Sequence, residues 1–211
     1  MAEYLLYGFA QSGNSYKAAL MLNLSGADWS ARFVDFFNGE TRTPAFRAIN
    51  VMGEVPVLEH GGKRLTQSGV ILDYLAERLG RFGPNDADER REILRWLLFD
   101  NHKLTSYTAT LRYLVSLAKT GETPVTEFLR ARMLAAFGIL DQHLGSRSFA
   151  LGERPTIADI SLCGYLYFPD EFGVSWTDFL NIGRWLDRIA ALPGWVHPYT
   201  LLPGHPLPAK G

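Results

Sequence analysis

Two serines and an asparagine stand close together near the start of the chain, where a strand pattern gives way to a helix pattern. Ser12 and Asn14 lie in the turn Gln11–Asn14, and Ser15 opens the helix that follows. A serine at such a place caps a helix, because its oxygen accepts a backbone N–H bond. The same hydroxyl can instead donate to an anion, which the field at a helix N-terminus also favours. The residues alone favour the cap for Ser12, with Ser15 competing for that role.

Two further polar groups have a similar pair of interpretations. Asn14 either orients a bound anion through its amide N–H groups or tolerates the unusual φ of a tight turn. Gln67 and Ser68 begin a helix, where free N–H groups suit a carboxylate ligand. Capping is the alternative for Ser68, and both roles can hold at once because a bound carboxylate completes the cap.

The composition is that of an ordinary globular protein, with 47% apolar and 20% charged residues among 211. A net charge of −1 gives no electrostatic reason to bind nucleic acid or a membrane surface. No apolar run approaches the ~20 residues that cross a bilayer, and no signal peptide is expected. Cys163 is the single cysteine, which excludes an intramolecular disulfide, and we expect an inert buried thiol. The five histidines lack metal-ligand spacing, so no metal site is predicted.

The first 80 residues alternate between strand and helix patterns. Short apolar runs indicate strands, and longer runs with helical periodicity indicate helices. We expect strands at Tyr4–Phe9, Arg32–Phe36, Val55–Glu59 and Lys63–Thr66, and helices at Ser15–Leu24 and Ser68–Leu79. The order is βαβ, an irregular crossover, ββ and α. It predicts an α/β thioredoxin-like domain with a mixed four-stranded sheet.

Strand patterns stop after Gly80. Residues 81–88 are rich in Gly, Pro and Asp, as domain linkers are, and helical periodicity begins at Glu89. We expect helices from Glu89 to Ala118 and at Val125–Leu144, Asp159–Phe168 and Asp178–Leu192, then an extended tail over Leu201–Gly211. The chain is therefore predicted to have an α/β domain at 1–80, a linker at 81–88 and an all-α helical bundle domain at 89–211.

Thr156–Asp159 has the pattern of a capping box at the start of one of these helices. In such a box the threonine hydroxyl accepts an N–H of the first helical turn, and the acidic side chain accepts the N–H of the threonine. The box should contribute about 1 kcal/mol to the helix start. It is a folding signal without functional content of its own.

Four segments resemble cytosolic glutathione transferases, in the same order and at similar spacing along nearly the whole chain. They are Ser12–Lys17, Asn50–Val57, Leu65–Leu75 and Gly152–Asp159. The resemblance implies a thiol-activating residue in the first, a loop that ends in a cis-proline in the second, and the γ-glutamyl site of glutathione in the third. The fourth is similar to the family's capping box. Glutathione is thereby implied as the co-substrate.

The resemblance changes the interpretation of the first turn. It implies that Ser12 is catalytic and donates to the glutathione sulfur, with Asn14 beside it. The pair is similar to the serine-using classes and to bacterial classes that combine a hydroxyl residue with an asparagine. Tyr7, the candidate for a tyrosine-using class, lies before the loop. Ser15 stands where many relatives carry cysteine, so no protein thiol is expected near glutathione.

The resemblance also assigns binding residues. An extended glutathione peptide would pair with the backbone of Val55, which a cis bond before Pro56 turns outward. The implied glutathione-binding set is Arg42, Glu54, Val55, Pro56, Gln67, Ser68 and Asp100. Asp100 has a structural alternative, the anchoring of a buried cap. The implied walls of the second-substrate pocket are Tyr107, Leu111, Tyr165 and Phe168, although aromatic residues at helical spacing also form cores.

The implied function is transfer of the glutathione thiolate to a small hydrophobic electrophile. Two alternatives stay open. One is glutathione-dependent reduction of disulfides or peroxides, with bound glutathione supplying the thiol. The other is a non-catalytic glutathione-binding or scaffold protein. The resemblance further implies a cytoplasmic homodimer, in which each small domain packs on the partner's large domain.

Overall fold

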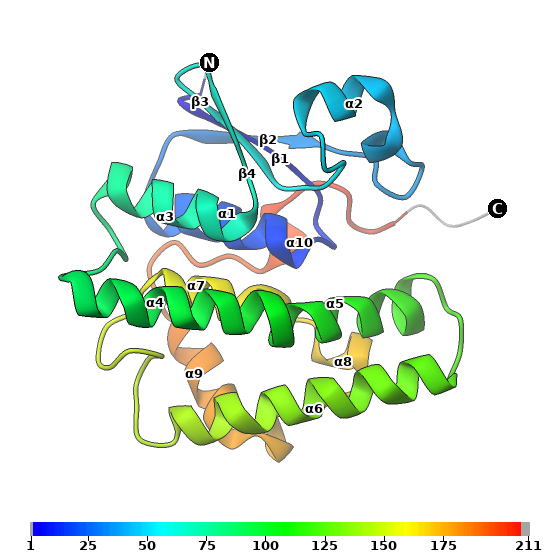
Figure 1. Cartoon of the computed structure of the whole chain (residues 1–211), viewed down its shortest axis with the longest axis vertical. Coiled ribbons are helices and arrows are strands. Elements are labelled where there is room, and N and C mark those ends of the chain that lie inside the picture. The colour runs from blue at the N-terminus through cyan, green and yellow to red at the C-terminus, as the bar shows by residue number, and fades with distance from the viewer. Residues whose placement is uncertain (1, 208–211) are drawn as a thin grey trace. The chain divides into compact units, whose positions relative to one another are not determined.

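The computed structural model describes residues 2–207 and divides into two compact units (Figure 1). Among the described residues, the first unit holds 2–81 together with 193–207, and the second holds 82–192. The sequence assigned everything after residue 89 to the helical domain. That assignment is wrong for the last segment, because its described part, 193–207, packs on the α/β unit.

The first unit is built on one four-stranded sheet with the strand order β2-β1-β3-β4. Its elements are β1 (Tyr4–Gly8), α1 (Gly13–Leu24), β2 (Trp29–Phe33), a 3-10 turn (Glu40–Arg42), α2 (Pro44–Ile49), β3 (Val57–His60), β4 (Lys63–Thr66), α3 (Ser68–Leu79) and α10 (Pro198–Leu201). β1 runs parallel to β2 and antiparallel to β3, and β3 is antiparallel to β4. The predicted thioredoxin-like domain with a mixed sheet is confirmed.

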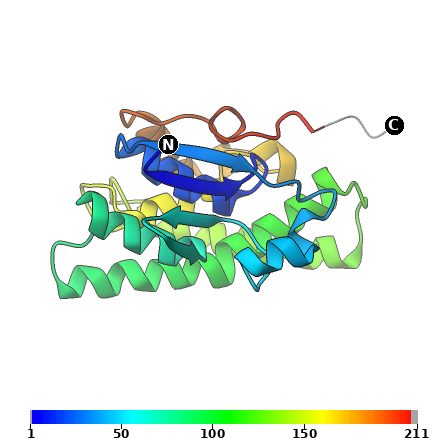
Figure 2. The same ribbon diagram turned by 90° about the horizontal axis from the view of Figure 1, so that it is seen from above.

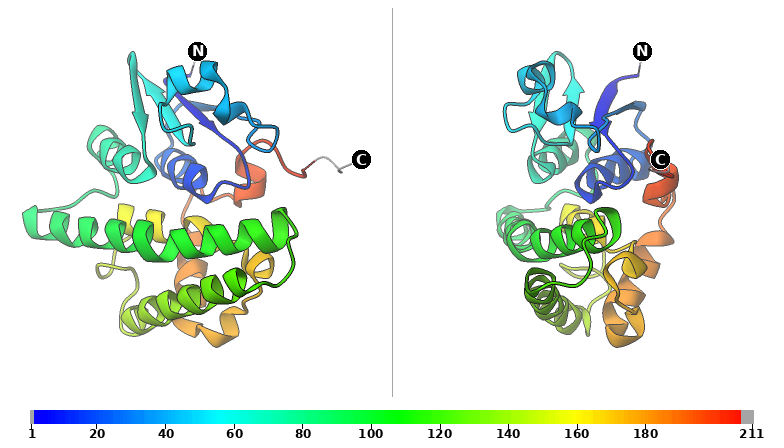
Figure 3. Two further views of the ribbon diagram at one scale, coloured as in Figure 1. Left: turned by 45° about the vertical axis from the view of Figure 1, so that its right-hand side comes forward. Right: turned by 90° about the vertical axis from the view of Figure 1, so that its right-hand side faces the viewer.

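Successive side chains of β1 point to opposite faces of the sheet. Tyr7 lies in a small core with Phe46 of α2, together with Val34 and Val57. Leu6 is fully buried on the opposite face, where α1 packs on β1. Figure 3 shows α1 and α3 together on one side of the strands and α2 apart from them. Both faces of β1, the strand that leads to Ser12, are therefore packed, and this packing restricts the position of Ser12.

Two strands begin elsewhere than predicted. β2 occupies Trp29–Phe33 rather than Arg32–Phe36, because its parallel pairing with β1 runs from Trp29 opposite Tyr4 to Phe33 opposite Gly8. β1 ends there, so the ladder ends too. β3 begins at Val57 rather than Val55, since Pro56 has no N–H to donate to a ladder.

The second unit is entirely helical, as predicted. Its elements are α4 (Ala87–Phe99), a π-helical turn (Asp100–Leu104), α5 (Thr105–Arg112), a second π-helical turn (Tyr113–Leu117), α6 (Pro124–Leu144), α7 (Ile157–Leu162), a 3-10 turn (Cys163–Tyr165), α8 (Pro169–Phe172), another 3-10 turn (Trp176–Asp178) and α9 (Leu180–Ala190). α4 and α5 form one continuous rod through their π-helical turn (Figure 1). α7 ends at Leu162, short of the predicted Phe168, because the chain tightens into a 3-10 turn before Pro169 starts α8.

The predicted capping box starts α7. Thr156 Oγ1 accepts from Ala158 N at 3.2 Å, and the Asp159 carboxylate accepts from Thr156 N at 2.8 Å. Asp159 also accepts from Ala150 N at 2.7 Å and from Trp185 Nε1 at 2.9 Å. The carboxylate is fully buried, and its oxygens bind together three segments of the helical unit.

The predicted tail at Leu201–Gly211 begins at the last residue of a short helix, and its described part, 202–207, has no helix or strand but packs on the first unit. Pro198–Leu201 forms the short helix α10, which packs on α1, and Leu202 is buried. Figure 3 shows α10 in red beside α1 in blue. Residues 208–211 of the predicted tail lie outside the described part of the chain.

Candidate functional site

The turn between β1 and α1 places Ser12 at the N-cap of α1. Ser12 N donates to Phe9 O at 3.0 Å, which closes the turn, and Ser12 Oγ accepts from Ser15 N at 3.1 Å. The capping role is therefore present. A hydroxyl has one proton and two lone pairs, so an oxygen that accepts Ser15 N still has its own O–H to donate. Ser12 can cap α1 and donate to a ligand at the same time.

The first turns of α1 and α3 lie against each other. Ser68, the first residue of α3, donates its hydroxyl to Asn14 Oδ1 at 3.4 Å. Neither helix has an acidic residue in its first turn, and the N-cap of α3, Gln67, makes no side-chain capping bond. Two helix N-termini thus meet without a carboxylate of their own helix to neutralise them. Such an arrangement suits an anionic ligand.

The loop before β3 supports the start of α3. Gln67 Nε2 donates to Glu54 Oε2 at 3.1 Å, and Asn50 Nδ2 donates to the Glu54 carbonyl at 2.8 Å. Asn50 Oδ1 in turn accepts from Met52 N at 3.1 Å. Asn50 is 4% exposed and holds this loop from within, a role that the sequence reasoning missed. Its place at the head of the Asn50–Val57 motif is the signal that could have identified it.

The other binding residues predicted in the first unit are arranged less closely. The Val55–Pro56 bond is cis, as the resemblance implies, and Val55 precedes the β3 ladder. Gln67 has φ 65°, a backbone conformation that favours glycine and that only the surrounding contacts can maintain. Arg42 ends the 3-10 turn before α2 and is exposed to solvent. Its contact with a glycyl carboxylate stays a prediction.

Tyr7 is not placed to activate a ligand thiol. Its ring is 7% exposed, belongs to the core beneath α2, and has the Arg32 guanidinium carbon 4.8 Å from its centroid. Burial, and then the neighbouring Glu59, raise the pKa of the Tyr7 phenol above its ordinary value. A phenol of raised pKa releases its proton less readily, so the packing around Tyr7 makes it a core residue.

Ser15, which stands where many relatives carry cysteine, is not accessible to a ligand. The residue is fully buried. A Cβ placed on Gly8 would lie 2.7 Å from both Cβ and Oγ of Ser15, so strand and helix touch here. Close packing of α1 on the end of β1, rather than contact with a ligand, explains the small residues at these two positions.

The predicted residues of the helical unit are largely internal. Asp100 is 1% exposed and accepts from Thr105 Oγ1 at 2.7 Å and from Ser161 Oγ at 2.5 Å. These contacts support the structural alternative for Asp100. Leu111 and Phe168 are buried, and the Arg112 guanidinium lies 3.6 Å from the Phe168 ring centroid. Tyr107 and Tyr165 are half-buried, and the role of all four as pocket walls stays a prediction.

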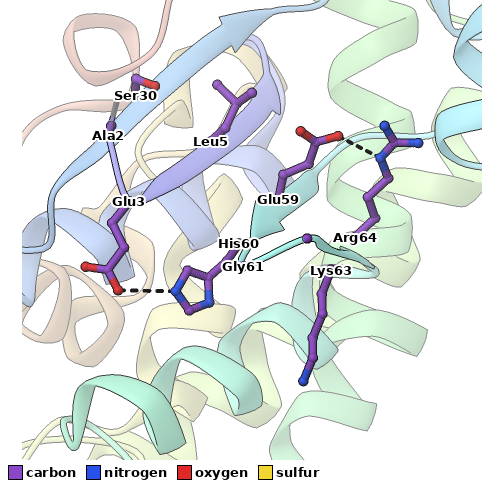
Figure 4. A pocket seen from close by; sticks show the side chains of 10 residues that line it. Ala2, Glu3, Leu5, Ser30, Glu59, His60, Gly61, Lys63 and Arg64 are labelled. Atoms are coloured by element: carbon purple, nitrogen blue, oxygen red, sulfur yellow. Dashed lines mark hydrogen bonds and ion pairs between the residues drawn. The ribbon is translucent and has the colours of Figure 1, made fainter.

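A hollow of about 900 Å³ lies at the opposite end of the sheet from Ser12. It is lined by residues just before β1 and around the β3–β4 hairpin, among them Glu3, His60 and Lys63 (Figure 4). His60 is held between Glu3 Oε1 at 3.2 Å and Tyr74 Oη at 2.7 Å. Because Ser12 follows the other end of β1, this hollow is separate from the two helix starts.

Within residues 2–207 there is no cluster of three or more His, Cys, Asp or Glu side chains suited to a metal ion. In the same residues no helix is both long and apolar enough to cross a membrane. Cys163 is buried, as expected, and its thiol donates to Ile160 O at 3.5 Å.

Comparison with known proteins identifies the family. Residues 2–77 match the family model described as Glutathione S-transferase, N-terminal domain, and residues 104–193 match Glutathione S-transferase, C-terminal domain. The maleylacetoacetate isomerase of Rhizobium meliloti is 32% identical over 199 residues, which cover 90% of this chain and 87% of that protein.

Solved structures agree with this match. A glutathione S-transferase from Pseudomonas fluorescens is 33% identical with a TM-score of 0.87, covering 93% of this chain and 99% of that one. A glutathione transferase from Burkholderia graminis, solved with two glutathione molecules bound per subunit, is 25% identical with a TM-score of 0.81, covering 98% and 90%. The fold is a thioredoxin-like unit followed in the chain by an all-helical unit. The chain belongs to the glutathione S-transferase family.

Proposed function

We propose that this protein conjugates the thiolate of glutathione to a hydrophobic electrophile. The observation that carries the proposal is the meeting of two helix starts, α1 at Ser12 and α3 at Ser68, through the 3.4 Å contact between Ser68 and Asn14. Glutathione carries a thiolate and a γ-glutamyl carboxylate on one short peptide. Each anion would have a helix N-terminus whose N–H groups and dipole favour it.

In this proposal the thiolate lies at the start of α1. A free thiol with a pKa near 8.5 is only about 3% ionised at pH 7, and the thiolate is the nucleophile. A pKa about two units lower would ionise roughly three-quarters of it, which requires about 2.7 kcal/mol of preference for the anion. The Ser12 O–H and the N-terminal field of α1 together supply that order of energy. Asn14 would contribute its amide N–H groups.

The γ-glutamyl carboxylate would lie at the start of α3, against the N–H groups of its first turn. The single O–H of Ser68, which donates to Asn14 Oδ1 in this structure, would turn to donate to the carboxylate when glutathione binds. Val55 would pair with the cysteinyl part of glutathione as an added strand, since it precedes the β3 ladder. The Gln67–Glu54 contact would hold the two binding segments together. Val55 would then hold the backbone of glutathione in place, and the start of α1 would activate its sulfur for attack on the electrophile.

The experiment compares three substrates with one preparation of the protein and with glutathione in excess. They are 1-chloro-2,4-dinitrobenzene for conjugation, maleylacetoacetate for isomerisation and bis(2-hydroxyethyl) disulfide for reduction. Conjugation predicts that glutathione is consumed and that a thioether forms with the first substrate. Retention on immobilised glutathione without turnover of any of the three would leave only the non-catalytic alternative.

Isomerisation is the second candidate, and the Rhizobium meliloti relative favours it. A thiolate that adds reversibly to an activated carbon–carbon double bond allows rotation about it and then leaves. The same activated glutathione would serve, but glutathione would be returned unchanged. Turnover of maleylacetoacetate with a constant thiol concentration would identify this activity.

Disulfide reduction keeps separate support from the Burkholderia graminis structure with two glutathione molecules per subunit. Exchange between a glutathione mixed disulfide and a second glutathione thiolate needs two such molecules. Oxidised glutathione would be the product. Its formation with the disulfide substrate, without thioether formation from the electrophile, would favour reduction over conjugation.

We further propose the two-fold homodimer of the family. Leu94 and Leu98, one turn apart on α4, are 54% and 62% exposed, and Val70 on α3 is 54% exposed. Exposed apolar side chains of this size suit an interface. Changing Leu94 and Leu98 together to glutamate should give a monomer in sedimentation at micromolar concentration. Ile139→Glu on α6, where the side chain is 51% exposed, is the control that should remain dimeric. A dimer in the double variant would exclude α4 from the interface.

A further inference from the structure

The C-terminal segment of the first unit, residues 193–205, runs along α1 and reaches the turn that carries Ser12. We refer to it as the strap. At the far end of α1, Asn23 Nδ2 donates to Gly194 O at 2.6 Å, and near the middle Tyr16 Oη donates to Val196 O at 3.0 Å. At the near end Ala10 N donates to Pro203 O at 2.8 Å. Figure 2 shows the strap in orange and red beside the blue of α1.

The turn before Ser12 depends on the strap for its hydrogen bonds. Ala10 is fully buried and Gln11 is 4% exposed, so their polar groups have little access to water. β1 ends at Gly8 and α1 begins at Gly13, which leaves Ala10 N outside both ladders. The strap carbonyls supply acceptors, one to Ala10 N and one to Gln11 Nε2, which donates to Gly204 O at 2.9 Å. A buried donor left without a partner is costly, so these bonds fix the turn.

The strap is itself held at the residue that meets Gln11. Gly204 has φ 95°, a conformation that favours glycine, and a Cβ there would lie 2.5 Å from Cε2 of Phe33 at the end of β2. Tyr199 and His205, which precede and follow Gly204 in the chain, stack with their ring centroids 3.6 Å apart. The carbonyl that Gln11 binds therefore has a defined position relative to the sheet.

We propose that Gln11 is a positioning residue for thiol activation: through Gly204 of the strap it holds the turn so that the Ser12 hydroxyl faces the glutathione sulfur. The proposal rests on the proposed role of Ser12. Gln11 acts through Ser12 and touches no substrate. A small displacement of a hydrogen-bond donor from a reacting atom is enough to lower a rate by orders of magnitude.

The test removes the same kind of bond at the two ends of the strap. Gln11→Met deletes the amide donor at the turn with little change of size, and Asn23→Leu does the same at the far end of α1. Gly204→Ala disturbs the same contact from the strap, because a Cβ at residue 204 would collide with Phe33, and it leaves the residues of the turn unchanged. The readouts are the pKa of the bound glutathione thiol, from its thiolate absorbance against pH, and kcat and KM for glutathione with one electrophile.

Gln11→Met and Gly204→Ala should each raise the pKa of the bound thiol and lower kcat about tenfold, with KM for glutathione within about twofold. Asn23→Leu should lower Tm but leave the thiol pKa unchanged. If Asn23→Leu shifts the thiol pKa as much as Gln11→Met, the strap serves general stability and the proposal is wrong. An unchanged thiol pKa in both turn variants would also overturn it.

Measurements in the Ser12→Ala variant distinguish the proposed role of Gln11 from the proposed role of Ser12, on which it rests. If the strap acts through Ser12, Gln11→Met should cause no further shift of the thiol pKa once Ser12 is alanine. A shift from Ser12→Ala without one from Gln11→Met would reject the strap proposal alone. No shift from Ser12→Ala would reject the role of Ser12 and, with it, the basis for positioning.

Discussion

The starts of α1 and α3 in the α/β unit differ from those of α4 and α7 in the helical unit. In the helical unit, Asp86 caps α4 with Asp88 and Glu89 in the first turn, and Asp159 occupies the start of α7. In the α/β unit, α1 and α3 have no acidic residue in their first turns. The first kind of start is satisfied by the protein's own carboxylates. The second has no carboxylate in its own first turn, and it is where we propose that glutathione binds.

The difference separates folding from function at positions that look alike in sequence. Thr156 and Ser12 both precede a helix and both accept an N–H of the first turn. At Thr156 the neighbouring carboxylate takes three further N–H groups and ties segments of the helical unit together. At Ser12 the neighbouring polar group is Asn14, which contacts the start of another helix instead. We therefore expect changes at the start of α7 to act on stability, and changes at the start of α1 to act on the proposed binding of glutathione.

The largest expected effect is a loss of stability from a change at the start of α7. Asp159→Ala leaves the buried donors of Ala150, Thr156 and Trp185 without their acceptor, so the free energy of unfolding should fall by about 3–5 kcal/mol. Urea unfolding measures it, and Asp159→Asn, which keeps one oxygen, should cost less. A loss below about 1 kcal/mol would mean that this start is not the anchor described.

The next effect belongs to the start of α3. Ser68→Ala removes a donor to a carboxylate that is present equally in the ground and transition states, so KM for glutathione should rise more than kcat falls. The expected cost is about 1.5–3 kcal/mol. Steady-state kinetics with varied glutathione decide it, with Ser106→Ala on the exposed face of α5 as the control. An unchanged KM would place the γ-glutamyl end elsewhere.

A smaller effect should follow when a carboxylate is added to the first turn of α1. Asn14→Asp puts a carboxylate in the first turn of α1, beside the proposed position of the thiolate. The like charge should raise the pKa of the bound thiol by about one unit, while the helix gains about 0.3–1 kcal/mol. Asn14→Ala shows how much of the change comes from losing the amide. A thiol pKa that is lower in Asn14→Asp than in Asn14→Ala would contradict the comparison.

Much of this fold could be predicted because its signals are local. The periodicity of Ser68–Leu79 gave the bounds of α3 correctly, and the Thr156–Asp159 pattern identified the start of α7. The shift of β2 could not be predicted, because its bounds depend on the length of β1, its partner in space. The strap was missed for the same reason. Pro203 and Gly204 resemble tail residues until their contacts with Ala10 and Gln11 are known.

The site was predictable to a similar limit. Ser12, Asn14, Gln67 and Ser68 were proposed through a family resemblance, and the structure adds that Asn14 and Ser68 are in contact. Gln11 was missed, since an amide that binds a backbone carbonyl has no sequence pattern of its own, and Asn50 was missed although it heads the Asn50–Val57 motif. Asp100 was placed in the glutathione-binding set on resemblance with a structural alternative, and its contacts with Thr105 and Ser161 support that alternative.

The pKa of the glutathione thiol bound to wild-type protein and to Ser12→Ala tests the central claim most directly. Thr123→Ala, which removes the cap of α6, is the control for the loss of a cap alone. If Ser12 activates the thiol, Ser12→Ala should have a higher thiol pKa and a kcat/KM lower by about tenfold or more, with glutathione retention preserved. Thr123→Ala should change neither quantity. Coincident pH–rate profiles for wild type and Ser12→Ala would contradict the account, because Ser12 would then be a cap and nothing more.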